Sequence, residues 1–215
     1  MKYKAAIFDL DGTLLNSMDS WDNVGKTFLE NHNIVPPYNL NEIIKEMSFN
    51  ESANYFKNSF GIKLSTEEII KSINKIVKNK YIYEIELKPY IKEYIYKLRS
   101  KGIRMCIATE LDKTLSKKAL ERLGILDYFE FIITSKEISA GKSKPDIYIK
   151  SMQKLGLSKE DIIVFEDSLY SIKTAKNEGF DVVGVYDKSS KKDLQKIKKL
   201  SNHFIYSFKE MEELF

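Results

Sequence analysis

Cysteine and histidine are scarce in this sequence. Its 215 residues include 1 Cys, Cys106, and 2 His, His32 and His203. A single cysteine excludes a disulfide-stabilised scaffold and a zinc site built from cysteines, and two isolated histidines leave little for any other zinc site. Because a chain without disulfides is typical of a reducing compartment, we expect a cytoplasmic protein in which Cys106 packs inertly within a strand.

Proline, glycine and long apolar runs are also few. With 4 Pro, 9 Gly and 43% hydrophobic residues, the composition indicates a folded chain rather than a disordered one. The apolar stretch near the N-terminus ends at Phe8. We expect it to be too short for a signal peptide, and no charge-free run of about 18 residues is present to span a membrane. We therefore expect no membrane partner, and either one large domain or a domain with a smaller insertion.

The excess positive charge is concentrated in one segment. Between Tyr186 and Leu200 there are six lysines and two aspartates, an excess equal to the +4 net charge of the whole chain. Nucleic-acid-binding surfaces combine basic residues with stacking aromatics or with a known reading module, and this segment has neither. We interpret it as a solvated helix face and expect no nucleic-acid partner.

Short apolar runs followed by polar residues predict strands that are covered on both faces. The predicted strands are residues 5–8, 103–108, 129–134, 162–165 and 182–185. Helical patterns lie between them, and each of four patterns is closed by a glycine, as a helix C-terminus favours: Gly102, Gly124, Gly156 and Gly179. Strands that alternate with helices predict an α/β fold with a parallel sheet and right-handed crossovers.

The stretch of residues 16–87 contains helical patterns only. Ser65 and Glu68 form a capping box ahead of the last of these patterns. Since no strand in this stretch can join the sheet, we expect an all-α insertion after the first strand. The predicted domains are a core of residues 1–15 and 88–215 and a smaller helical domain of residues 16–87.

Two aspartates follow the first predicted strand. Asp9 and Asp11 are two positions apart, so in extended chain their Cα atoms lie about 6.6 Å apart and their side chains point the same way. Gly12 then permits a sharp turn. Two carboxylates this close repel each other, so one must be protonated or a cation must lie between them. Either state suits catalysis, because a carboxylate can act as a nucleophile or ligand and a carboxylic acid as a proton donor.

Further polar residues follow the other predicted strands. Ligands in open parallel sheets bind beyond the carboxyl ends of the strands, so Thr109, Glu166 and Asp167 are expected at the same rim as the two aspartates. Four carboxylates at one rim require cations. All-oxygen ligation suits Mg²⁺, and Lys142 or Lys144, after the third strand, is placed to add a positive charge.

In this order, these motifs resemble those of the haloacid dehalogenase-like hydrolase superfamily. The resemblance runs from Tyr3 to about Val185 and covers four motifs: Asp9-Leu10-Asp11-Gly12-Thr13, then Thr109, Lys142 and Glu166-Asp167. It implies a Rossmann-like parallel sheet with helices on both faces and a helical cap domain inserted after the first strand.

The resemblance also implies a mechanism. Asp9 is the implied nucleophile, which forms an aspartyl-phosphate, and Asp11 protonates the leaving oxygen and later activates water. The implied Mg²⁺ ligands are the Asp9 side chain, the Asp11 main-chain carbonyl and Asp167, with Glu166 nearby.

The remaining implied residues bind the substrate. Thr109 and Lys142 would hold the phosphoryl oxygens and balance their charge. The inner face of the cap would select the substrate, and our candidates there are Asn16, Met18, Asp19, Trp21, Phe49 and Asn50.

Glu110 departs from the family pattern, because the residue after the motif threonine is usually small or an amide. A carboxylate beside a phosphate site is unfavourable. Our hypothesis is that Glu110 either points outward or recognises an amino group on the substrate.

The presence of Asp11 distinguishes between the activities found within the superfamily. The dehalogenases lack an acid at this position because a halide needs no proton, whereas an alkoxide does. We therefore predict a phosphatase that acts on a small phosphorylated metabolite. A sugar-phosphate mutase of the beta-phosphoglucomutase type is the alternative. Against it, Trp21 stands where such mutases place a histidine and Phe49 where they place an arginine.

Two other classes of protein share some of these features. A phospho-acceptor signalling module also combines acidic residues, threonine and lysine around an aspartate, but such modules are shorter and their acceptor follows a later strand. A catalytically silent binding protein is disfavoured because every catalytic position is filled. We expect a monomer or a weak dimer.

Overall fold

The computed structural model describes residues 2–44 and 47–211. The chain divides into two compact units, which we call the α/β unit and the helical unit. The α/β unit comprises the residues up to 18 together with those from 85 onward, and the helical unit comprises residues 19–84.

The α/β unit is built on a six-stranded parallel sheet of order β3-β2-β1-β4-β5-β6. Its strands are β1 (Ala5–Phe8), β2 (Arg104–Thr109), β3 (Ile132–Thr134), β4 (Ile162–Glu166), β5 (Asp181–Val185) and β6 (His203–Ile205). The parallel α/β fold predicted from the sequence is therefore confirmed. Strand β1 lies in the middle, with Phe8 opposite Ile107 of β2 on one side and Phe165 of β4 on the other.

Two details of the predicted sheet were wrong. β6 was missed because it is a short edge strand without an apolar run, and it pairs with β5 at the edge of the sheet. The third strand begins at Ile132 rather than at Phe129. Phe129 instead packs edge-on against the ring of Phe8, with ring centroids 6.0 Å apart.

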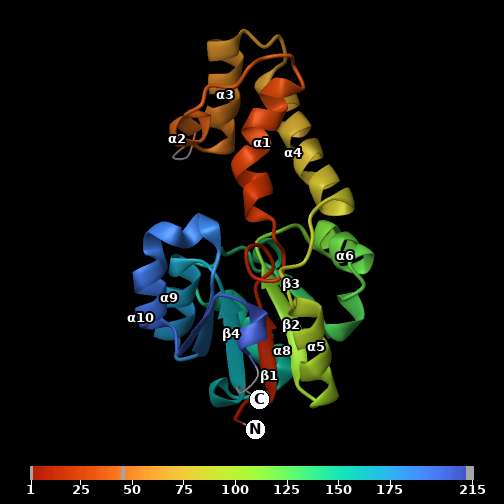
Figure 1. Ribbon diagram of the computed structural model, residues 1–215, viewed down its shortest axis with the longest axis vertical. Coiled ribbons are helices and arrows are strands. Elements are labelled where there is room, and N and C mark those ends of the chain that lie inside the picture. Colours follow the sequence, from red (N-terminus) through yellow and green to blue (C-terminus); the bar gives the residue numbers. More distant parts are fainter. Residues whose placement is uncertain (1, 45–46, 212–215) are drawn as a thin grey trace. The chain divides into compact units, whose positions relative to one another are not determined.

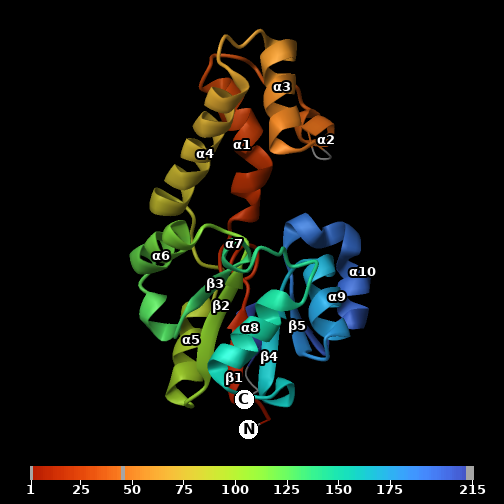
Figure 2. The same ribbon diagram turned by 180° about the vertical axis from the view of Figure 1, so that it is seen from behind.

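Helices cover both faces of this sheet. They are α5 (Ile91–Ser100), α6 (Lys113–Arg122), α7 (Ser135–Ile138), α8 (Asp146–Leu155), α9 (Leu169–Asn177) and α10 (Leu194–Leu200), with short 3₁₀ turns η1 (Leu126–Tyr128), η2 (Lys159–Asp161), η3 (Lys188–Asp193) and η4 (Phe208–Glu210). Figure 1 shows α5 in front of the sheet, and Figure 2 shows α8 in front of the opposite face. The glycines predicted to end helices all have positive φ, for example Gly156 at 64°.

Alternate side chains of the central strand β1 pack into two different hydrophobic cores. Ile7 belongs to a buried cluster with residues of α8, α9 and α10, including Tyr148 and Ile172. The next side chain, Phe8, stacks on Phe165, which in turn meets Tyr94 of α5. Burial of β1 on both faces explains why its sequence is a continuous apolar run rather than an alternating one.

The basic segment after β5 forms η3 and α10, and most of its lysines are exposed, as predicted for a solvated helix face. It still packs on the sheet through Ile197, which is buried. Asp187, at its start, is buried as well and pairs with Lys88 at 2.8 Å.

The helical unit contains no strand among its described residues. It consists of α1 (Met18–Glu30), α2 (Leu40–Ile44), α3 (Phe49–Phe60) and α4 (Thr66–Tyr83), packed around a core that includes Phe28, Phe56 and Ile69. The predicted capping box of Ser65 and Glu68 is present at the start of α4.

The residues at the junction of the two units belong to the α/β unit. Leu15 forms a bridge with Leu87, the Asn16 amide donates to the Glu86 carbonyl (2.9 Å), and the Lys88 amide donates to the Leu14 carbonyl (2.9 Å). These backbone bonds lie within the α/β unit, and the expected limits of residues 16–87 for the helical domain stay a prediction. Among the described helices, none has the length and apolar character needed to cross a bilayer.

The strand order reverses direction between β1 and β4. From β1 the chain moves to β2 and β3 on one side, and then crosses to β4, β5 and β6 on the other. In open α/β sheets, ligands bind beyond the carboxyl ends of the strands, at the point where the helices that follow two neighbouring strands lie on opposite faces of the sheet. Phe8 and Phe165 are the paired residues there, so the residues that follow them should form the site.

Substitution of Gly184, in β5, tests how tightly this sheet packs against its neighbours. A Cβ at this position would lie 2.5 Å from Ser201 Oγ and 2.9 Å from Ile197 Cγ2. Gly184→Ala should therefore lower the free energy of unfolding by about 1–3 kcal/mol in a urea titration. Adding Ser201→Ala should recover part of the loss, and an unchanged stability of the single variant would contradict this packing.

Candidate active site

A buried lysine lies at the carboxyl ends of β1 and β4. Lys142 is only 2% exposed. Its Nζ donates a hydrogen bond to Asp9 Oδ1 and another to Glu166 Oε1, the latter at 2.6 Å. The sequence left Lys142 and Lys144 open as the cation, and the structure places Lys142 in the cluster while Lys144 is exposed.

The sheet brings the two carboxylates together. Asp9 directly follows β1, and its amide donates to the carbonyl of Phe165 at 3.0 Å. Glu166 is the last residue of β4. Because β1 and β4 are neighbours in register, residues 157 positions apart in the sequence share one buried point at the strand ends.

Tyr148 also contacts this cluster. Its hydroxyl donates to Glu166 Oε1 at 2.8 Å, and its side chain is fully buried. The sequence analysis missed this residue, because a tyrosine within the amphipathic pattern of α8 is indistinguishable from a core residue. The bond to Tyr148 and the ion pair with Lys142 together hold one oxygen of Glu166.

Asp167 completes the acidic cluster. One ligand atom from each of Asp9, Glu166 and Asp167 lies within 4.8 Å of the others. Thr13 donates to Asp167 Oδ1 at 3.3 Å. At the start of α9, which follows this cluster, Ser168 makes no side-chain cap bond.

Burial shifts the pKa values of the ionisable groups in this cluster. Burial raises the pKa of Asp9, and the positive charge of Lys142 opposes this rise. Burial and the Asp9 carboxylate raise the pKa of Glu166 to about 7, and the same two causes raise the pKa of Asp167 well above its usual value. Burial alone would lower the pKa of Lys142, but Asp9 and Glu166 raise it, so the lysine stays charged.

The charges of the cluster balance only if carboxylates take up protons or if a further cation binds. Three ionised carboxylates against one lysine leave a net charge of −2 in a buried place, which is strongly unfavourable. A divalent cation would cancel that charge, and the donors present are carboxylate oxygens, which hard cations prefer. The cluster therefore has the composition and the charge that a metal site of this kind needs.

Asp11 lies apart from the three clustered carboxylates. Its side chain is half-buried, and Ser17 Oγ donates to Asp11 Oδ1 at 2.6 Å. The two aspartates were expected to point the same way along extended chain. β1 ends at Phe8, the chain turns at Gly12, and Ser17 beyond this turn bonds to Asp11, while the common direction of the two side chains stays a prediction.

Gly12 lets this loop approach Asp167 closely. It has a φ of +82°, and a Cβ built on it would lie 2.7 Å from Asp167 Cγ. Both the backbone angle and the contact require glycine here.

Thr109 and Glu110 occupy the end of β2. Thr109 is buried, and its Oγ1 accepts a hydrogen bond from the Leu111 amide at 3.1 Å. Glu110 is exposed, but both of its carboxylate oxygens accept bonds from other parts of the chain, the Lys142 amide and the Tyr170 hydroxyl.

The predicted substrate-selecting residues lie mostly in the helical unit. Trp21 Nε1 donates to the Tyr81 hydroxyl at 2.8 Å within that unit, and Phe49 is 54% exposed. Asn16 is exposed at the junction. Their contact with a substrate stays a prediction.

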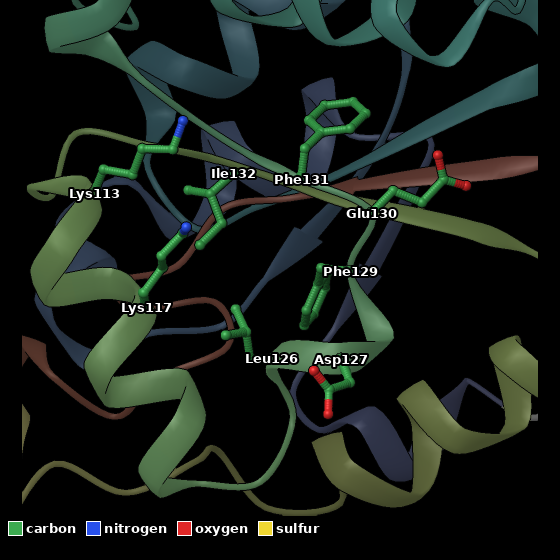
Figure 3. A pocket seen from close by; sticks show the side chains of 8 residues that line it. All are labelled: Lys113, Lys117, Leu126, Asp127, Phe129, Glu130, Phe131 and Ile132. Carbon is green, nitrogen blue, oxygen red and sulfur yellow. The ribbon is translucent and has the colours of Figure 1, made fainter.

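A separate hollow of about 430 Å³ lies beside α6 and the edge strand β3 (Figure 3). It is lined by Lys113, Lys117, Leu126, Asp127, Phe129, Glu130, Phe131 and Ile132. Lys113 pairs with Glu137 and Glu130 pairs with Arg104, so its charges are partly neutralised by the chain itself. None of the predicted site residues lines it, and the acidic cluster remains the candidate active site.

Comparison with known proteins identifies the family. The profile of the haloacid dehalogenase-like hydrolases matches residues 6–185. This chain belongs to that family. The resemblance proposed from the motifs is therefore confirmed.

Relatives of this hydrolase have names that refer to phosphate chemistry. It is 27% identical over 181 residues to the phosphorylated carbohydrates phosphatase of Thermotoga maritima, a match that covers 83% of this chain and 82% of that protein. It is 27% identical over 190 residues to the beta-phosphoglucomutase of Bacillus subtilis, covering 85% and 83% of the two chains.

The fold of this hydrolase matches solved structures over its full length. A crystal structure of a candidate beta-phosphoglucomutase from Thermotoga maritima superposes with a TM-score of 0.87, at 22% identity, and covers 99% of this chain and 100% of that one. The predicted Rossmann-like architecture is confirmed by this match.

Substitution of Gly12 tests the close approach to Asp167. Gly12→Ala should cost more free energy of unfolding than Gly156→Ala, because Gly156 has a similar positive φ but no atom within 4 Å of the added Cβ. The control should lose about 1–2 kcal/mol from backbone strain, and Gly12→Ala should lose clearly more. Equal losses in urea titrations would show that Gly12 and Asp167 are not in contact.

Proposed function

We propose that this hydrolase is a Mg²⁺-dependent phosphatase that acts on a small phosphorylated metabolite through an aspartyl-phosphate on Asp9. The observation that carries the proposal is the buried cluster of Lys142 with Asp9 and Glu166, beside Asp167, at the switch point of the sheet. Its family and a relative named as a phosphatase of phosphorylated carbohydrates support a phosphate ester as the substrate.

Asp9 is the proposed nucleophile. An oxygen of its carboxylate bonds to phosphorus while the bond from phosphorus to the leaving oxygen breaks. This step needs an ionised Asp9, although burial raises its pKa. The neighbouring Lys142 favours the ionised form and balances negative charge on the transferred group.

Asp11 is the proposed acid and base. It gives a proton to the leaving oxygen and later takes a proton from the water that attacks the aspartyl-phosphate, which frees phosphate and restores Asp9. The hydrogen bond from Ser17 supports this role because it orients the carboxylate of Asp11.

The metal site is proposed on the acidic cluster. Asp9 and Asp167 would hold Mg²⁺ together with the main-chain carbonyl of Asp11, while Glu166 keeps its bonds to Lys142 and Tyr148. When bound, the ion would supply positive charge for the phosphoryl oxygens. Thr109, buried at the end of β2, is proposed to hold another phosphoryl oxygen.

We propose that residues 16–87 act as a cap that selects the substrate and excludes water. Asn16, Trp21 and Phe49 are the proposed substrate contacts. A sugar-phosphate mutase remains the second candidate, because a mutase is among the relatives. Phosphate release without isomerisation of a hexose phosphate would favour the phosphatase.

The catalytic assignment predicts a specific loss of activity. Asp9→Asn should abolish the hydrolysis of an aryl phosphate, and Asp11→Asn should lower kcat by about a hundredfold or more, since it removes the proton donor. Asp127→Asn makes the same chemical change at an exposed position on the α/β unit and should leave kcat unchanged.

Chelation by EDTA should also stop turnover, and added Mg²⁺ should restore it. Hydrolysis that persists in Asp9→Asn or in EDTA would contradict the mechanism. A single stoichiometric phosphorylation without turnover would indicate a phospho-acceptor module instead.

The raised carboxylate pKa values predict how Mg²⁺ binding depends on pH. The pKa of Glu166 is about 7 in the folded protein and 4.5 ordinarily, so between these values the metal-free folded protein binds more protons than the unfolded chain. Its stability should therefore fall as the pH rises through this window.

Because Mg²⁺ competes with these protons, the rise in Tm that it causes should be larger at about pH 8 than at about pH 6. Thermal unfolding with Mg²⁺ and with EDTA measures this difference. Asp167→Asn should reduce it, and a Tm shift that stays constant or shrinks as the pH rises would argue against a cation in the cluster.

A further inference from the structure

The carboxylate of Glu110 joins three segments that are distant in the sequence. Glu110 directly follows β2. Its Oε1 accepts a hydrogen bond from the backbone amide of Lys142 at 3.0 Å, and its Oε2 accepts one from the hydroxyl of Tyr170, in α9, at 3.0 Å. Glu110 is nevertheless exposed to solvent. Two bonds to the chain itself indicate a role besides the two considered from the sequence, outward pointing and recognition of a substrate amine.

The loop that carries Lys142 needs such support. It runs between α7, whose C-cap residue Ser139 has a left-handed φ of 54°, and the start of α8 at Asp146. The long side chain of Lys142 is fixed in one buried conformation, and fixing a lysine in this way costs much rotamer entropy. A charged acceptor such as the Glu110 carboxylate makes a stronger hydrogen bond with the Lys142 amide than a neutral acceptor would. This bond fixes the backbone to which the Lys142 side chain is attached.

Two neighbours of Glu110 fit this arrangement. A Cβ on Gly141 would lie 3.1 Å from Glu110 Oε1. The loop therefore passes close to the Glu110 carboxylate at Gly141, which has no side chain. Burial and the Glu110 carboxylate raise the pKa of Tyr170, so its hydroxyl keeps the proton that it donates. Tyr170 thus orients one oxygen and leaves the other directed to the Lys142 amide.

We infer that Glu110 is a positioning residue, which fixes the loop of Lys142 and so sets how the lysine ammonium meets Asp9 and the phosphoryl group. The effect on catalysis rests on the proposed phosphatase function, whereas the effect on the loop does not. Glu110 itself touches neither Asp9 nor Glu166 in any hydrogen bond of the described structure.

Hydrogen exchange tests the structural half of this inference. In Glu110→Ala, the amides of residues 140–144 should exchange faster than in the natural protein, while exchange in β1 and β4 should stay the same. Glu110→Gln keeps an oxygen that can accept from the Lys142 amide, so it should retain most of the protection. Glu130→Ala is the matched control, because Glu130 also accepts two bonds, from Arg104, but stands before β3 at the opposite end of the sheet.

Kinetics tests the catalytic half. With an aryl phosphate that has no amino group, Glu110→Ala should lower kcat by about tenfold, since one charge-assisted hydrogen bond is lost, and should change KM little. Glu110→Gln should restore most of kcat, and Tyr170→Phe should give a smaller loss in the same direction. The loss in Glu110→Ala should be equal for amino-bearing and neutral phosphate esters.

The outcomes separate this inference from the proposed function. Unchanged exchange of residues 140–144 in Glu110→Ala would overturn the positioning role, even if the enzyme is a phosphatase. A loss confined to amino-bearing esters would overturn it as well, in favour of substrate recognition. If the natural protein hydrolyses no phosphate ester but the exchange result holds, the proposed function fails and the structural role of Glu110 stands.

Discussion

A charged lysine buried among carboxylates is the interaction on which this site depends. Lys142 pairs with Asp9 and Glu166 where solvent is excluded, and Asp167 adds a third acidic group within reach. Removing such charges from water is costly unless each finds a partner. One lysine cannot balance three carboxylates, so the cluster has the charge to hold a divalent cation. The same imbalance supports the proposal that a metal ion binds here, since a divalent cation would offset the net charge of three ionised carboxylates and one lysine.

The sheet supplies this arrangement through its strand order. β1 and β4 are neighbours, and the crossover direction reverses between them, so Asp9, just after β1, and Glu166, the last residue of β4, lie at the switch point of the sheet. The loop before α8 then brings Lys142 to the same point. Strands buried on both faces hold these ends rigidly, because Ile7 and Phe8 each pack into a separate core. Packing far from the chemistry therefore fixes the positions of the charged groups.

The sequence predicted the elements with strong local signals. Apolar runs ending in Asp9 and Glu166 identified β1 and β4, and the family resemblance selected Lys142. It could not find β6, which is short and lies at an edge, nor Tyr148, which matches the core pattern of its helix. The partners of Glu110 were also hidden, because contacts with residues 32 and 60 positions away depend on how loops meet in three dimensions. Local periodicity carries no information about such contacts.

The proposed mechanism forms a bond between an oxygen of Asp9 and phosphorus, and trapping this intermediate is the decisive experiment. The enzyme would be mixed with Mg²⁺ and a radiolabelled phosphate ester, quenched in acid during turnover, and digested for mass spectrometry of the labelled peptide. We expect an acid-stable, alkali-labile phosphoryl group on the peptide that contains Asp9. A label on any other residue, or turnover at full rate with no labelled peptide, would contradict it.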